Sequence, residues 1–115
     1  MIGKIIAGSS FGATVSYVMK EQSRILSFEG IEPPNVQDMV RDFKDQTLLN
    51  PRIKNAVGHI SLSFSVKDAD KLTDPIMAQI AREYMERMGI RNTQFLIVRH
   101  TDQAHPHCHI VYNRI

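Results

Sequence analysis

The sequence predicts an α+β fold in which helices pack on a central, mainly antiparallel sheet. Apolar residues follow the helical period in three segments, and alternating or β-branched runs mark strands between them. The elements follow one another as β-α-β-α-β-α-β-β, which predicts a largely antiparallel sheet covered by helices on its apolar side. A chain of 115 residues is long enough for one domain with one hydrophobic core.

The N-terminal part predicts a strand, a helix and a second, short strand. Residues 1–7 (MIGKIIA) form the first strand, and Ser10 offers a hydroxyl N-cap for a helix over residues 11–20. A short strand is expected over residues 24–28. The helix carries an apolar stripe of Phe11, Val15, Val18 and Met19. Tyr17 falls well outside this stripe, so we expect it on the surface.

The second helix is predicted over residues 36–49, with Asn35 as its N-cap and Pro51 ending it. Its core face has the spacing of an amphipathic helix and consists of Val36, Met39, Val40 and Phe43.

Residues 57–66 (VGHISLSFSV) alternate between apolar and polar side chains, which predicts a strand with one buried face. The polar face carries His59, Ser61, Ser63 and Ser65. It is either an ordinary solvent-exposed face, or a hydroxyl-lined surface that adjoins the histidines described below and binds a phosphodiester backbone. The sequence leaves both interpretations open.

The third helix is expected after a charged connector, residues 67–72. Thr73 caps it, Pro75 lies in its first turn, and Gly89 closes it after about Met88. Its expected buried stripe consists of Ile76, Ile80, Ala81, Tyr84 and Met88.

Four of the five histidines fall within ten positions near the C-terminal end. Residues 93–100 (TQFLIVRH) predict a strand, and residues 101–106 predict a hairpin loop. His107 and His109 follow on one face of the next strand, because residues two apart in a strand point the same way. If His100 pairs opposite His107, Val98 lies opposite His109, and the three histidines share one face.

Such a triad predicts a metal site. Neighbouring Cβ atoms on that face are roughly 5–7 Å apart, close enough for the imidazole nitrogens of His100, His107 and His109 to converge on one ion. Three protein ligands leave a coordination position open, as in catalytic sites. Neutral imidazole suits zinc, nickel, copper, iron or manganese, so the ligands do not name the metal. The alternative is a histidine-rich surface hairpin that binds no metal.

The composition limits the function further. The net charge is only +2 and the basic residues are scattered, which weakens a nucleic-acid interpretation without excluding it. The single Cys108 excludes an internal disulfide, and the sequence shows neither a signal peptide nor a membrane span, so we expect a cytoplasmic protein. Because the chain stops directly after a strand, we expect residues 1–115 to be an N-terminal fragment of a longer protein.

Three segments together resemble the relaxases, the mobilization nucleases of conjugative and mobilizable elements, and in particular the MobA/VirD-type (MOBP) branch. Residues 4–19 (KIIAGSSFGATVSYVM) resemble the first motif of that family, and residues 58–65 (GHISLSFS) resemble the second. The third and most specific motif is matched by His100, Asp102, His105, His107, His109 and Asn113.

The resemblance implies an HUH endonuclease fold for residues 1–115, and it implies the chemistry. Tyr17 would attack a phosphodiester at an origin of transfer, giving a 5′-phosphotyrosyl link and a free 3′-OH. A divalent ion (Mg, Mn, Zn or Ni) held by the three histidines would stabilise the charge on the phosphate oxygens. Asp102 would orient a ligand imidazole, or His105 would accept the proton.

The implied partner is single-stranded or supercoiled DNA of an origin of transfer, with accessory mobilization proteins as further partners. The expected DNA contacts are Ser61, Ser63, Arg99, Asn113 and Arg114.

Two other functions are compatible with parts of the pattern. Residues 105–111 (HPHCHIV) also fit a histidine-triad nucleotide hydrolase or transferase, which would use His105, His107 and His109 without a metal. His100 and Asp102 would be superfluous in that mechanism. The third possibility is a metal- or DNA-binding module without catalytic activity.

Overall fold

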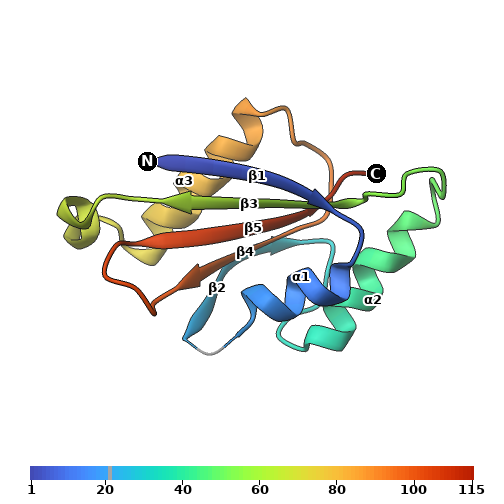
Figure 1. Ribbon diagram of the computed structural model, residues 1–115, viewed down its shortest axis with the longest axis horizontal. Helices are drawn as coiled ribbons and strands as arrows, with labels where there is room; N and C mark the ends of the chain where they lie inside the picture. Colours follow the sequence, from blue (N-terminus) through green and yellow to red (C-terminus); the bar gives the residue numbers. More distant parts are fainter. Residues whose placement is uncertain (21) are drawn as a thin grey trace.

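Five strands form one antiparallel sheet in the order β1-β3-β5-β4-β2 (Figure 1). The computed structural model describes residues 1–20 and 22–115. The strands are β1 (Ile2–Gly8), β2 (Ser23–Glu29), β3 (Val57–Ser63), β4 (Phe95–His100) and β5 (His107–Asn113). The helices are α1 (Phe11–Val18), α2 (Val36–Thr47) and α3 (Asp74–Arg87), and a 3-10 helix, Val66–Lys71, replaces the expected connector. The predicted α+β class and element order are confirmed.

Helices cover both faces of the sheet, not the one apolar face that the sequence predicted. Helices α1 and α2 pack with one set of strand residues, including Leu96 and Val98, and α3 packs with the alternate set, including Ile97 and Ile110. The reason lies in the central strands. β4 and β5 carry apolar side chains on both faces, as strands buried between two layers do.

The predicted helix starts are confirmed by their capping bonds. The side-chain oxygens of Ser10, Asn35 and Thr73 each accept a hydrogen bond from a backbone N–H three residues later. Beyond α3, Gly89 has φ +75°, a left-handed conformation that favours glycine at a helix end.

Of the stripe predicted for α3, Ala81 is confirmed as buried, and the other four positions are wrong. Ile76 and Met88 are exposed, and Ile80 and Tyr84 only border the core. The residues that α3 buries are Met77, Ala78, Ala81 and Met85. The first helix was predicted correctly, since it buries Phe11, Val15 and Val18.

The strand register brings the histidines together. His100 pairs with His107, and Val98 pairs with His109, as the sequence predicted. On the other side of β5, Ser61 of β3 pairs with His109, and Ser63 pairs with His107. The face beneath α1 and α2 therefore continues into a polar area formed by three neighbouring strands. Within the described residues, no helix is long and apolar enough to cross a membrane.

Candidate active site

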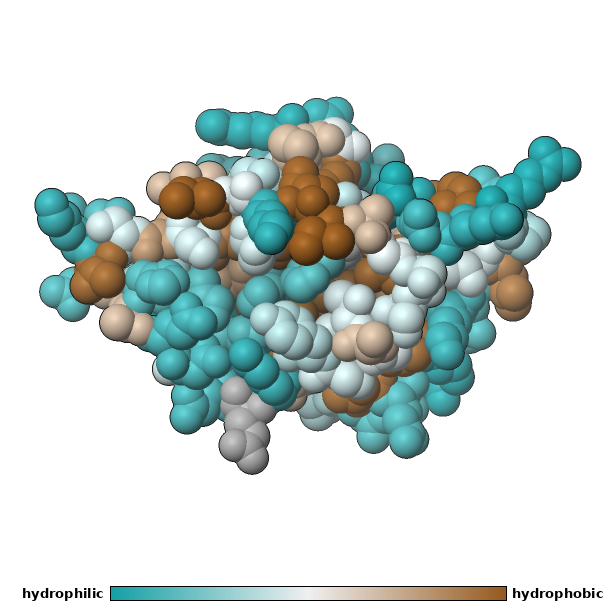
Figure 2. Space-filling view, in the orientation of Figure 1, coloured by the Kyte–Doolittle hydropathy of each residue, from teal (hydrophilic) through white to brown (hydrophobic). Residues whose placement is uncertain are grey.

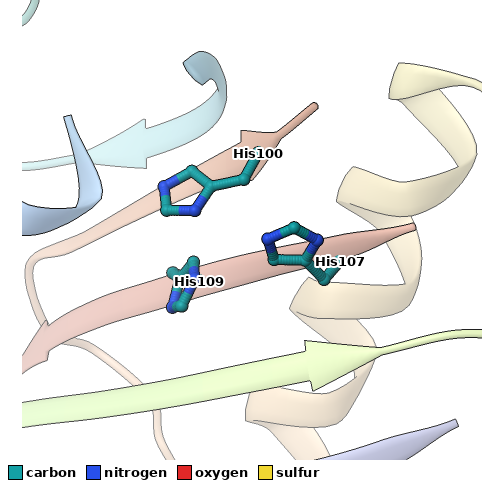
Figure 3. Close-up of side chains that lie close together, drawn as sticks. All are labelled: His100, His107 and His109. Atoms are coloured by element: carbon teal, nitrogen blue, oxygen red, sulfur yellow. The ribbon is translucent and has the colours of Figure 1, made fainter. Parts of the chain in front are cut away.

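His100 of β4 and His107 and His109 of β5 point into one space on the same face of the sheet (Figure 3). Their exposed fractions are 2%, 7% and 6%, and each offers a ring nitrogen within 4.8 Å of those of the other two. Ligands of a tetrahedral ion with bonds of about 2.1 Å are roughly 3.4 Å apart, so the rings need to close by about an ångström. The three buried histidines could therefore bind a metal ion.

The hydrogen bonds of His100 show which of its nitrogens is free. Its Nε2 lies 2.8 Å from the carbonyl oxygen of Val18, and because a carbonyl only accepts, Nε2 carries the proton and donates. Nδ1 then holds a lone pair. It is buried and has no hydrogen-bond partner among the described residues. A buried lone pair without a donor is costly, and a cation would satisfy it. The buried, unpaired lone pair of His100 Nδ1 is the feature of the described residues that best fits a bound metal ion.

His107, the first residue of β5, is the triad member next to the β4–β5 loop. Its Nδ1 donates a hydrogen bond of 3.4 Å to the carbonyl oxygen of His105, which leaves Nε2 free. Oδ1 of Asp102 lies 3.5 Å from that Nε2. Asp102 is in turn held by Lys20, whose Nζ is 3.2 Å from Oδ2, and this contact lowers the pKa of the Asp102 carboxyl. In this tautomer Nε2 carries a lone pair and cannot donate to the Asp102 carboxylate, so the carbonyl oxygen of His105 orients the ring, and Asp102 places negative charge beside the candidate metal ligand.

His59, which the sequence analysis left without a role, is a fourth member of the cluster. Its Nε2 lies 2.8 Å from Nδ1 of His109, and the two ring centroids are 5.0 Å apart. The strand alternation placed His59 on the correct face. The missing information was that β3 lies directly beside β5, which sequence alone does not give.

The cluster favours neutral imidazoles. Burial, followed by the nearby His100, His59, His107 and Lys20, lowers the pKa of His109 to about 3. Burial is also the main cause that lowers the pKa of His59 and of His107. Metal ligation requires the unprotonated ring, so the site is in the ligand-competent form at neutral pH.

Tyr17 lies next to this histidine cluster, and its side chain is open to solvent. It is 51% exposed, and its ring centroid is 5.6 Å from that of His109, 6.1 Å from that of His59 and 6.2 Å from that of His100. Helix α1 buries its apolar stripe in the core, which leaves Tyr17 outside that stripe and beside the histidines. Lys20, a second residue that the sequence analysis missed, places Nζ 5.1 Å from the centre of the Tyr17 ring. A phenol and a cation thus lie together at the triad.

The five expected DNA contacts do not lie together. Ser61 and Ser63 are half-buried on the histidine face, and Arg114 is exposed and donates to the carbonyl oxygen of Asn55. The expectation for Arg99 needs correction. Its Nη1 donates to the carbonyl oxygen of Leu72 and pairs with Asp74, beside α3 on the opposite face of the sheet.

Asn113 also needs correction, because it is a core residue. It is 2% exposed, and its Nδ2 donates to the carbonyl oxygen of Phe43 and to Oε1 of Gln94. These bonds tie β5 to α2 and to the start of β4. The amide is therefore engaged inside the protein and does not face DNA.

His105 does not join the triad. It is exposed on the β4–β5 loop, and its ring centroid is 6.0 Å from that of His107. The convergent set is His100, His107 and His109, whereas a histidine-triad nucleotide hydrolase would need His105 in that set. The geometry disfavours this alternative.

An antiparallel sheet that carries His-x-His on its central strand, with a third histidine opposite and a tyrosine in front, defines an endonuclease fold of the HUH class. The family model described as "Relaxase: MobA/VirD2-like, nuclease domain" matches residues 17–115, and the chain belongs to this relaxase family. The matched range includes Tyr17 and all five histidines. Comparisons with curated proteins and with solved structures gave no match. Family membership supports a role in DNA nicking during mobilization.

Proposed function

We propose that residues 1–115 form a relaxase catalytic domain that cleaves one DNA strand at an origin of transfer and stays covalently attached to it through Tyr17. The observation that carries the proposal is the position of Tyr17. An exposed phenol lies against the buried histidine triad, with ring centroids 5.6 Å apart at the closest pair. A tyrosine needs such surroundings, because it is a weak nucleophile on its own.

The proposed step exchanges one phosphate ester for another. Oη of Tyr17 attacks the phosphorus, and the bond from phosphorus to the 3′ oxygen breaks. The electron pair leaves with the 3′ oxygen, which takes up a proton and becomes a 3′-OH. The phosphorus stays bonded to the 5′ oxygen and to Tyr17. Because one ester bond replaces another, the step is reversible, as strand rejoining requires.

The phenol proton passes to water or to His105. Tyr17 is exposed, so water reaches its hydroxyl. His105 lies on the neighbouring β4–β5 loop and remains the proposed protein base. Asp102 is proposed to act from the same loop, because its Oδ1 lies 3.5 Å from Nε2 of His107, where a carboxylate would favour a bound cation.

The three histidines would hold the divalent ion through Nδ1 of His100 and Nε2 of His107 and His109. A bound ion would draw charge from the non-bridging phosphate oxygens and stabilise the transition state. The histidine donors suit Mn, Zn or Ni, and Mg would bind where phosphate and water complete the coordination.

The DNA would lie on the histidine face. Ser61 and Ser63 offer hydroxyls beside His109 and His107, and Lys20 offers positive charge. Arg114, beyond the other end of β5, would contact a more distant part of the DNA. The proposed partners are single-stranded or supercoiled origin DNA, together with accessory mobilization proteins. A cytoplasmic location would follow from such a DNA substrate.

A covalent adduct tests this function. The protein is incubated with Mn²⁺ and single-stranded oligonucleotides that tile the origin of transfer, and the products are separated under denaturing conditions. We expect a DNA–protein adduct that Tyr17→Phe abolishes and that EDTA prevents. Tyr112→Phe is the matched control, because Tyr112 lies on the opposite face of β5, against Gly58.

Each other outcome contradicts a separate part of the proposal. An adduct that persists in Tyr17→Phe would assign the nucleophile elsewhere. Cleavage that survives EDTA would remove the metal from the mechanism. DNA binding without cleavage by the wild type would favour a binding module.

A further inference from the structure

His109 is the triad member whose second nitrogen is held by another side chain. For His100 and His107, the nitrogen that faces away from the site donates to a backbone carbonyl oxygen, of Val18 and of His105. Nδ1 of His109 instead meets Nε2 of His59 at 2.8 Å. The orientation of His109 therefore depends on a side chain that can be substituted without changing the backbone.

The sheet places His59 where this contact is possible. In β3, His59 pairs with Ile6 of β1 on one side and with Val111 of β5 on the other. Ser61, two residues on and on the same face, pairs with His109. His59 and His109 are thus diagonal neighbours across β3 and β5, a separation that imidazole rings can span. Their ring planes are tilted by 38°.

The direction of the hydrogen bond follows from the metal site. When Nε2 of His109 binds an ion, a neutral imidazole must carry its proton on Nδ1. Nδ1 then donates, so Nε2 of His59 must accept and the proton of His59 must be on Nδ1. The opposite arrangement would put the His109 proton on Nε2 and block the ligand position.

We propose that His59 is a positioning residue that accepts a hydrogen bond from Nδ1 of His109 and so holds the Nε2 lone pair of His109 toward the metal ion. The inference rests on the metal site of the proposed function and adds a residue to it. His59 does for His109 what Val18 and His105 do for the other two ligands. Partners of this kind fix the tautomer and the ring orientation of metal-binding histidines.

Two substitutions separate this role from simple packing. His59→Leu fills similar space without an acceptor. His59→Gln can place Oε1 near the original Nε2 and accept the same hydrogen bond. We expect His59→Leu to weaken Zn²⁺ binding by about 10- to 100-fold and His59→Gln to restore most of that loss. Ile6→Ala, at the exposed position paired with His59, is the control and should bind Zn²⁺ as the wild type does.

The affinities are measured by competition with a chromophoric chelator, and thermal unfolding of each metal-free variant verifies its fold. The ¹⁵N shifts of the Zn²⁺-loaded wild type give the tautomers independently, and we expect the proton on Nδ1 of both His59 and His109. Wild-type affinity in His59→Leu, or a proton on Nε2 of His59, would overturn the role of His59 alone. Equal losses in His59→Leu and His59→Gln would likewise refute it. If the wild type binds no Zn²⁺, Mn²⁺ or Ni²⁺, the metal site itself fails, and this inference fails with it.

Discussion

Nε2 of His100 lies 2.8 Å from the carbonyl oxygen of Val18, and this contact joins the candidate metal centre to the helix that carries Tyr17. Val18 is the last residue of α1, where carbonyl oxygens lack partners within the helix. His100, a candidate metal ligand, thus donates a hydrogen bond to one of them. The position of α1, which carries Tyr17, and the orientation of His100 are therefore coupled.

This coupling predicts different effects for substitutions of two candidate metal ligands. Without metal, His100→Ala should speed amide hydrogen exchange in α1 by about fivefold, the ratio for a lost hydrogen bond of about 1 kcal/mol. His107→Ala should leave exchange in α1 unchanged, because its partner is the carbonyl oxygen of His105 in the β4–β5 loop. Both variants should lose metal binding. Equal exchange in both variants would show that the Val18 contact carries no free energy.

Lys20 is expected to act on the reaction more than on stability. Its ion pair with Asp102 is largely solvent-exposed, and such pairs contribute little to folding. Lys20→Met should therefore keep the urea midpoint of the wild type but slow adduct formation by roughly fivefold, as expected when about 1 kcal/mol of charge stabilisation is lost. Lys67→Met, in the distant 3-10 helix, serves as the comparison. An unchanged rate for Lys20→Met would remove this residue from the site.

Asn113 should prove to be a structural residue. Asn113→Ala leaves the buried partners of its Nδ2 without a donor and should lower the free energy of unfolding by about 1–3 kcal/mol. Asn50→Ala, at an exposed position after α2, should cost far less. The measurement is urea unfolding. Unchanged stability with weakened DNA binding would instead restore the DNA contact expected from the sequence.

The histidine cluster predicts that the metal-free protein loses stability as the pH falls below 6.5. The folded-state pKa of His109 is lowered to about 3 by burial, whereas in the unfolded chain it is near 6.5, so the unfolded state binds more protons between these values. His59 and His107 are shifted in the same direction. Stability is full above pH 6.5, and His109 alone can remove up to about 1.4 kcal/mol per pH unit below it.

Urea unfolding with EDTA, from about pH 7.5 to about pH 5.5, measures this effect. The carboxyls with lowered pKa, Asp74 and Asp102, have ordinary values of 3.8 and lose their contribution only at lower pH. The decline in this interval therefore reports on the histidines. If the free energy of unfolding stays constant or rises as the pH falls, the folded state does not lower the pKa of these histidines.

Local periodicity was sufficient to predict most of the site. The spacing of His107 and His109, the hairpin pairing with His100 and the angular position of Tyr17 are properties of short segments, and the structure confirms these placements. Relations between distant segments were not predictable in this way. The contact of His59 with His109 depends on β3 lying beside β5, and the burial of Asn113 depends on where α2 packs.

Two predictions were wrong for a related reason. These are the buried residues of α3 and the expectation that helices cover only one face of the sheet. Amphipathic spacing shows that a helix has an apolar side, but the sheet residues opposite it decide which neighbouring positions are covered. Ile76 and Met77 are both apolar, and packing against the face of Ile97 and Ile110 buries Met77.

The order of the strands has a consequence for the newly made protein. β5 comes fifth along the chain but lies in the middle of the sheet, between β3 and β4, and it carries two of the three histidines that could bind a metal ion. A nascent chain on the ribosome therefore lacks both the central strand and the ion site until residue 109 has been translated. Truncated translation products that stop before β5 would consist of two unjoined sheet halves, and they would lack His107 and His109.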